Sequence, residues 1–181
     1  MNNFLKISGD YETWIVYRKS VVICDVTEMF ITRALPKGSR TIDQMRRAAR
    51  SCKQNIVEGV SDGTVSIEMC IKLIGVARGS IMELREDYAD FLRQHKCEIW
   101  GRDDPRTLAT RNYCRCHYDP REFVEKCENR SVETVANIML TLIRQMEAML
   151  AKVLKSLESR FIEEGGLKEA MSRERRRRRG Y

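Results

Sequence analysis

The sequence predicts an all-α protein, an antiparallel up-and-down four-helix bundle. Ten glycines and three prolines in 181 residues are few, which disfavours a protein of many short strands and turns. Four long segments place apolar residues three and four positions apart, the spacing of one helix face. The charged fraction of 33% is typical of helices that bury one stripe. Length gives no reason for two independent domains, so we expect one bundle over 1–163 and a short C-terminal segment over 164–181.

The first predicted helix covers about 12–34, and its apolar stripe begins with Trp14 and Tyr17. Pro36 ends it, because proline cannot continue the ladder of backbone hydrogen bonds, and Gly38 permits the turn that follows.

The second predicted helix covers about 39–59. Thr41 with Gln44 three residues later fits a capping box at its start. Gly59 is the expected end, since glycine commonly follows the last helical residue.

The third predicted helix, about 64–95, has the most regular spacing in the chain, which indicates lengthwise packing at a shallow angle. Its stripe is Ile67, Cys70, Ile74, Ala77, Ile81, Leu84, Tyr88, Phe91 and His95. Gly75 and Gly79 lie off this stripe. Each costs about 1 kcal/mol of helix propensity relative to alanine, so we expect a neighbouring backbone to approach closely there.

The fourth predicted helix, about 131–163, carries two adjacent apolar stripes. The first is Val132, Val135, Met139, Leu142, Met146, Met149 and Val153, and the second is Ile143, Leu150, Leu154, Leu157 and Phe161. Two stripes give more apolar surface than one helix of a four-helix bundle can bury against its neighbours. Because large exposed apolar patches usually mark interfaces, we expect self-association.

The segment 97–130 is an insertion between the third and fourth helices. Structureless loops of this length are rare in compact domains, so short helices are expected. Asp104-Pro105 and Asp119-Pro120 each fit an N-cap followed by proline at the first helical position, and Glu122 completes a capping box with Asp119.

Positive charge is concentrated in two places. Residues 171–181 hold six arginines and one glutamate, a net +5 of the chain's +7. Residues 37–59 hold six cations and two acids, a net +4, so the remainder of the chain carries a small negative excess. An uneven distribution of this kind favours anionic partners at defined surfaces.

The basic residues of the second helix are the main functional candidates. Ile42, Met45, Ala49, Cys52 and Ile56 form its apolar stripe. Arg46, Arg50 and Lys53 follow the same spacing about a quarter turn away, and Arg40 and Arg47 lie further round. Guanidinium groups bind phosphate oxygens in a bidentate manner. The alternative is a solvated face whose arginines pair with the neighbouring acids Glu83, Glu86 or Asp87.

The C-terminal arginines are expected to be disordered when free, because like charges repel and no apolar residue folds them. They form either a phosphate-binding arm or a solubilising terminus, and the absence of lysine favours the arm. The residues are Arg173, Arg175, Arg176, Arg177, Arg178 and Arg179. No cluster of exposed aromatic residues accompanies them, so stacking on nucleic-acid bases is not predicted.

Seven cysteines, an odd number, are scattered through the chain. With no signal peptide and no apolar run of about 20 residues, they indicate a reduced, cytoplasmic protein. Cys114 and Cys116 with His117, flanked by Cys97 and Cys127, form the one group typical of zinc ligands. Its paired ligands are separated by one residue instead of the usual two to four, so zinc binding is the lesser alternative and we predict no cofactor.

Catalysis is not predicted. The chain has only two histidines, His95 and His117, and His95 continues an apolar stripe. Asn55 and Glu58 have no acid, base or nucleophile at a suitable spacing, and we expect them to be buried polar residues that set helix register.

The motif Gln44-x-Arg46-Arg47-Ala48-Ala49-x-Ser51, followed by Asn55-Ile56-x-Glu58-Gly59, resembles the signature of the bacterial four helix bundle proteins. These include proteins encoded by intervening sequences within 23S ribosomal RNA genes and accessory variability proteins of diversity-generating retroelements. Ala77-Arg78-Gly79-Ser80 with Glu83-Leu84 is similar to the third helix of the family, and residues 161–171 resemble the C-terminal suffix of a longer subgroup.

The resemblance spans 12–95 and 131–171 and implies a ring-shaped homo-oligomer, a pentamer, with basic surfaces that bind RNA or DNA. It also implies a reverse transcriptase as a partner of the retroelement members. The insertion 97–130 departs from the short members. From sequence we therefore expect a non-catalytic, oligomeric protein that binds nucleic acid, RNA before DNA. The first rival is a structural protein–protein interaction bundle without nucleic acid, and the second, less favoured, is a zinc-binding protein or metal-dependent enzyme built on 97–127.

Overall fold

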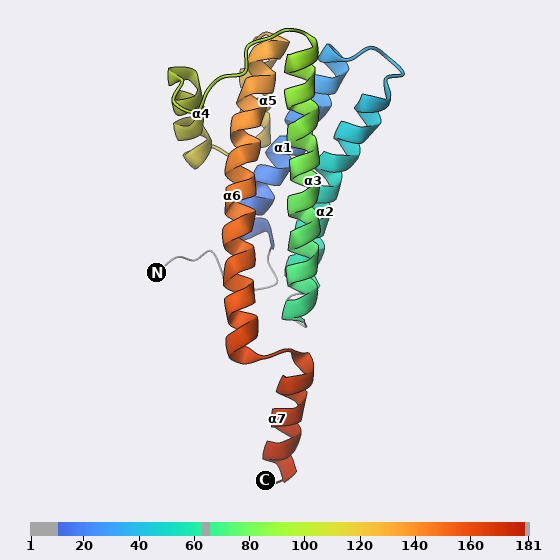
Figure 1. Cartoon of the computed structure of the whole chain (residues 1–181), viewed down its shortest axis with the longest axis vertical. Helices are drawn as coiled ribbons and strands as arrows, with labels where there is room; N and C mark the ends of the chain where they lie inside the picture. The colour runs from blue at the N-terminus through green and yellow to red at the C-terminus, as the bar shows by residue number, and fades with distance from the viewer. Residues whose placement is uncertain (1–10, 63–65, 180–181) are drawn as a thin grey trace.

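The computed structural model describes residues 11–62 and 66–179, and this part of the chain is helical without any strand (Figure 1). A 3-10 turn precedes seven α-helices. The elements are η1 (Tyr11–Thr13), α1 (Ile15–Ala34), α2 (Arg40–Asp62), α3 (Ile67–Gln94), α4 (Pro105–Cys116), α5 (Pro120–Glu128), α6 (Val132–Glu164) and α7 (Leu167–Arg179). The predicted all-α class is confirmed.

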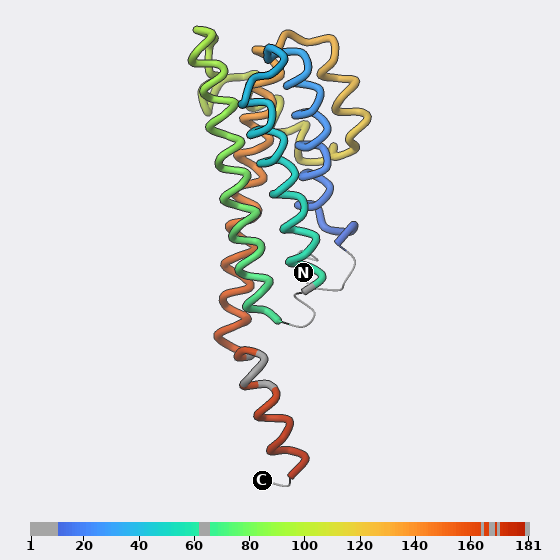
Figure 2. The backbone as a smooth tube through the Cα atoms, turned by 90° about the vertical axis from the view of Figure 1, so that its right-hand side faces the viewer, coloured from blue at the N-terminus to red at the C-terminus, as the bar shows by residue number. Residues whose placement is uncertain are grey.

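The four long helices lie side by side along the long axis of the molecule (Figures 1 and 2). α2 packs against α1 and α3, and α6 packs against the same two helices from the other side. Buried residues of all four helices form one hydrophobic core. The short helices lie outside it, α4 against α6 and α5 against α1.

Helix α2 begins near residue 39 as predicted but ends later than predicted. Ser39 caps its start, because the Ser39 hydroxyl accepts a hydrogen bond from the Thr41 amide at 3.3 Å, so Thr41 is not the cap. The helix also continues past Gly59 to Asp62. Gly59 is buried, and a Cβ there would lie 3.3 Å from side-chain atoms of Leu73 and Ile74, so this glycine lets α2 approach α3 closely.

No other described part of this chain makes the close approach predicted at Gly75 and Gly79. Both glycines are exposed on α3, and a Cβ at either would meet nothing within 4 Å. Helix α3 begins at Ile67, after the N-cap Ser66, and the predicted start at residue 64 lies outside the described residues. His95 is an exposed C-cap residue and does not continue the buried stripe.

Both apolar stripes of α6 lie against other parts of the same chain. Val135, Met139, Leu142, Met146 and Val153 of the first stripe are buried, as are Ile143, Leu150 and Leu157 of the second. The remaining members, Val132, Met149, Leu154 and Phe161, are half-buried. The stripes therefore give no argument for self-association, because α4 covers a side of α6 that a bare four-helix arrangement leaves open.

The insertion 97–130 folds as predicted into short helices with aspartate caps. The Asp104 carboxylate accepts from the Arg106 amide at 2.7 Å, and that of Asp119 accepts from the Glu122 amide at 3.0 Å. The amide of Trp100 donates to Asn137 Oδ1 of α6 at 2.8 Å, which ties the start of the insertion to the core helices.

Candidate nucleic-acid interface

Arg46 of α2 binds carboxylates. Its Nη2 and Nε lie 2.7 and 2.9 Å from the two carboxylate oxygens of Glu28 on α1, and its Nη1 lies 3.3 Å from Asp43. The hydrogen bonds from Arg46 lower the pKa of the Glu28 carboxyl below its usual value. Arg46 thus links α1 to α2. This pairing with an acid of a neighbouring helix is the kind that the alternative of a solvated face predicts, although the acid is Glu28 of α1 and not one of α3.

Lys53 also faces α1 and is half-buried. Burial raises the pKa of Asp25, and the positive charge of Lys53 acts in the opposite direction. Burial likewise raises the pKa of the Cys24 thiol to about 11, against the charges of Lys53 and Arg50. The α1-facing edge of α2 is therefore a mixed surface of cations and acids.

Three arginines of α2 are free of such pairing. Arg40, Arg47 and Arg50 are exposed, and within the described part of the chain no carboxylate lies within 4.0 Å of them. The alternative pairing with Glu83, Glu86 or Asp87 is absent among the described ion pairs. We call Arg40, Arg47 and Arg50 the α2 arginine strip.

The C-terminal arginines lie on a helix, α7, so the disorder predicted for the run from Arg175 to Arg179 is wrong. Glu174 accepts hydrogen bonds from Arg177 at 3.1 Å and from Arg178 at 3.0 Å, pairs three and four residues apart that stabilise a helix. Arginine itself has a high helix propensity. All six arginines of α7 are exposed.

The two basic segments do not form one surface. α7 projects beyond the ends of the core helices, past the end of α2 that is distant from Arg40 (Figures 1 and 2). Any single ligand that contacts both must extend along the molecule.

An acidic group on α3 contrasts with these segments. Asp87 is half-buried, and burial together with the charges of Asp90 and Glu83 raises its pKa to about 6. No cation of the described residues forms an ion pair with Asp87, so the α2 arginine strip does not neutralise it.

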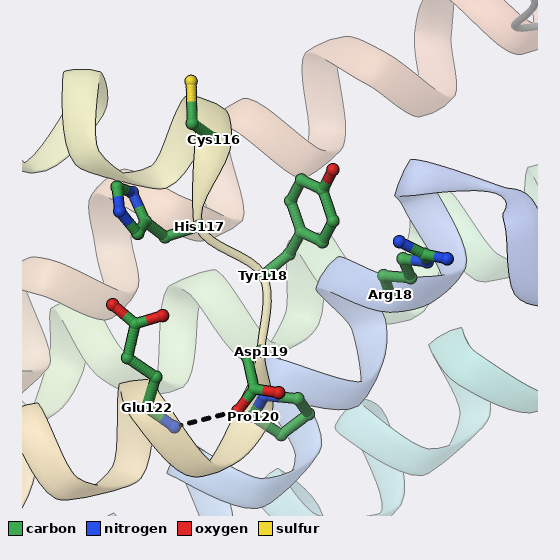
Figure 3. Close-up of a pocket in the computed structure, with 7 residues that line it drawn as sticks. All are labelled: Arg18, Cys116, His117, Tyr118, Asp119, Pro120 and Glu122. Carbon is green, nitrogen blue, oxygen red and sulfur yellow. Dashed lines mark hydrogen bonds between the residues drawn. The ribbon is translucent and has the colours of Figure 1, made fainter.

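Two of the five candidate zinc ligands, Cys116 and His117, line a cleft of about 400 Å³ (Figure 3), and the other three are not among its lining residues. Cys116 and His117 point in different directions there. The His117 ring stacks on Tyr113 at 4.0 Å and donates from Nδ1 to the Tyr113 carbonyl at 2.9 Å. Cys114 is buried. Among the described residues no three His, Cys, Asp or Glu side chains are grouped to hold a metal ion, so the zinc alternative gains no support.

Three further residues were missed or misplaced from sequence. Glu58 is exposed, and Asn55 is half-buried, donating to the Ser51 carbonyl at 2.8 Å. Lys19 is buried, which its position three residues after Val16 and four before Ile23 on an apolar stripe could have indicated.

No protein-family model matches this chain, and comparisons with curated proteins and with solved structures return no match. The resemblance of the α2 motif to the bacterial four helix bundle proteins therefore stays a prediction. None of the described helices is long and apolar enough to cross a membrane.

Proposed function

We propose that this chain is a non-catalytic, cytoplasmic RNA-binding protein, an antiparallel four-helix bundle that binds phosphates through α7 and the α2 arginine strip. By its resemblance we further propose a homo-oligomer, a pentamer, with a reverse transcriptase as a candidate partner. The two basic segments act as separate contacts on one extended polyanion, which gain affinity by being linked.

The observation that carries the proposal is the excess of exposed arginine on α7. Residues 167–179 hold seven cations and two acids. Among the described contacts, Glu174 accepts from Arg177 and Arg178, and Arg176 donates to Ser172 at 3.3 Å. A helix that exposes this many guanidinium groups displaces counterions from phosphates and gives affinity without base sequence preference.

A shared exposed face on α3 supports self-association. Met69 and Val76 are 42% and 46% exposed, and the exposed Gly75 and Gly79 leave the backbone open beside them. A second copy could approach this face more closely than any face lined with long side chains. The same face favours the rival function, a protein–protein interaction bundle without nucleic acid.

Purification with and without a high-salt nuclease step tests the RNA proposal. A gentle preparation should retain nucleic acid, seen as a raised ratio of absorbance at 260 to 280 nm, and should lose it with salt because phosphate contacts are screened. The protein remaining should keep its oligomeric mass. A gentle preparation that carries no nucleic acid and binds no added RNA would refute the function.

The substitution Gly79→Gln tests the proposed assembly separately. The open space at this position lets a monomer accept the side chain, whereas an interface in which a different face of the next copy packs closely on α3 would not. We expect the solution mass to fall with the helical circular dichroism unchanged. Gly101→Gln, at an exposed position that also has open space but lies outside α3, is the control.

A further inference from the structure

Lys19 is the one side chain among the described residues that is both charged and buried, with 3% of its surface exposed. Its Nζ donates to the Cys114 carbonyl and to Gln145 Oε1, the latter at 3.4 Å. Both acceptors are neutral, and burial lowers the pKa of Lys19. A buried ammonium without a negative partner is costly, so an anion beside it would be stabilising.

Lys19 lines a cleft of about 510 Å³ between α1, α4 and α6. Three more cations line the same cleft, Arg111 and Arg115 from α4 and Lys152 from α6, and no Asp or Glu does. None of the four forms an ion pair with a carboxylate of the described residues. The thiol of Cys114 beside Lys19 is no substitute, because burial raises its pKa to about 11 and keeps it neutral.

The wall of this cleft is apolar. Val16 and Val153 are buried, and Met149 is half-buried between the cations and the core. Gln145 holds two sides together, since its Nε2 donates to the Arg111 carbonyl at 2.8 Å while its Oε1 accepts from Lys19. The cleft is thus held by hydrogen bonds of the chain itself, and its volume lies within the ~300–1,000 Å³ of small-molecule sites.

We propose that this cleft binds a small amphipathic carboxylate of the fatty-acid type. The carboxylate lies among Lys19, Arg111, Arg115 and Lys152. The hydrocarbon chain covers the apolar lining that stays partly exposed, Ile15, Ala148 and Met149. A nucleic-acid phosphate would gain from the four cations but would leave the apolar wall in water, so the amphipathic anion suits the whole lining better.

Titration calorimetry of the full chain with dodecanoate, below the concentration of micelle formation, tests the proposal. Acetate supplies the charge without the chain, and dodecyltrimethylammonium supplies the chain with the opposite charge. Dodecanoate should bind with one molecule per chain and about tenfold or more tighter than either, since a charge-assisted hydrogen bond adds to the apolar burial. Equal binding of the ammonium compound, or no binding of dodecanoate, would overturn it.

A matched pair of lysines on α6 locates the site. Lys152 lines the cleft, whereas Lys155 is exposed and lies outside its lining. Lys152→Met should weaken dodecanoate binding about tenfold, and Lys155→Met should not change it. Equal effects of the two variants would contradict the assignment. If Lys152→Met weakens binding of an RNA oligonucleotide and leaves dodecanoate unchanged, the cleft belongs to the nucleic-acid surface and the proposal fails.

Lys19→Met removes the buried charge itself. The fold tolerates it where an apolar side chain of similar length replaces an uncompensated ammonium, and dodecanoate binding should fall at least as much as in Lys152→Met. A folded Lys19→Met variant with unchanged dodecanoate affinity would exclude Lys19 from the site.

Discussion

Helices α2 and α7 are both rich in arginine, but their charges have different surroundings. α2 lies against α1, whose Glu28 accepts two hydrogen bonds from Arg46 and whose Asp25 lies near Lys53. α7 projects away from the core helices, and its main described acceptor is its own Glu174 (Figure 1). The same residue type therefore joins helices in one region and stays available in the other.

The difference shows that a count of cations overstates the binding surface of α2. Two of its five candidate residues, Arg46 and Lys53, face acidic side chains, which leaves the α2 arginine strip of Arg40, Arg47 and Arg50. Free positive charge depends on which neighbouring helix supplies carboxylates, and that is a property of packing.

The largest expected effect comes from replacing Arg175, Arg176, Arg177, Arg178 and Arg179 together by glutamine. Loss of five phosphate contacts should lower the affinity for a single-stranded RNA by about 10²-fold or more at low salt. The slope of the logarithm of the binding constant against the logarithm of the salt concentration should become shallower by about 3.5. Fluorescence anisotropy across a salt series measures both. Retained affinity with an unchanged slope would place the binding surface elsewhere.

Glutamine at Arg40, Arg47 and Arg50 should have a smaller effect. Three contacts fewer correspond to a slope reduced by about 2 and an affinity lowered by about tenfold. Thermal unfolding should not change, because these side chains form no described ion pair. A marked fall in Tm would show that the strip stabilises the fold instead.

Asp87→Asn extends the comparison to a charge of the opposite sign. The folded pKa of Asp87 is about 6, above the ~3.9 of an unfolded chain. The folded protein therefore holds the proton more tightly, and stability is lost as the pH rises from about 4 to 6. The variant escapes this loss, so its Tm should exceed that of the native chain at pH 7.5 and equal it near pH 4. A difference in Tm between the two proteins that does not change with pH would contradict the raised pKa of Asp87.

Arg46→Gln should have the smallest effect on RNA binding and a characteristic effect of pH on stability. Arg46 lowers the pKa of Glu28 in the folded state, so their contact stabilises above the unfolded pKa of about 4.3 and is lost as the pH falls through the folded value. The Tm of the variant should be lower than that of the native chain at pH 7, and this difference in Tm should disappear as the pH falls below the pKa of Glu28. If Arg46→Gln lowers the RNA affinity as much as glutamine at Arg40, Arg47 and Arg50 does, Arg46 is part of the binding surface.

Periodicity predicted the long helices because each buries one face, and the aspartate caps of α4 and α5 followed from local chemistry. The role predicted for Gly59, the end of a helix, was wrong. Gly59 is next to Val60 and three residues after Ile56 on the buried side, so its position on the stripe was the available signal for the close contact with α3.

The candidate site was less predictable than the fold. Helical spacing places Arg46 and Lys53 on one flank of α2 but does not say which neighbour that flank meets. The cleft around Lys19 could not be predicted, because it depends on where the insertion places α4 against α6.

The junction between α6 and α7 determines where the C-terminal arginines point. Gly165 ends α6 with φ +75° and ψ 173°, a backbone region essentially reserved for glycine. At Gly166 a Cβ would lie 2.5 Å from a Glu68 carboxylate oxygen of α3. Gly165 thus sets the direction in which the chain leaves α6, whereas the nearest atom to a Cβ at Gly166 is the far end of a flexible glutamate side chain. Another residue at position 165 would redirect the arginines of α7 and so alter the reach of the protein, with every charge kept.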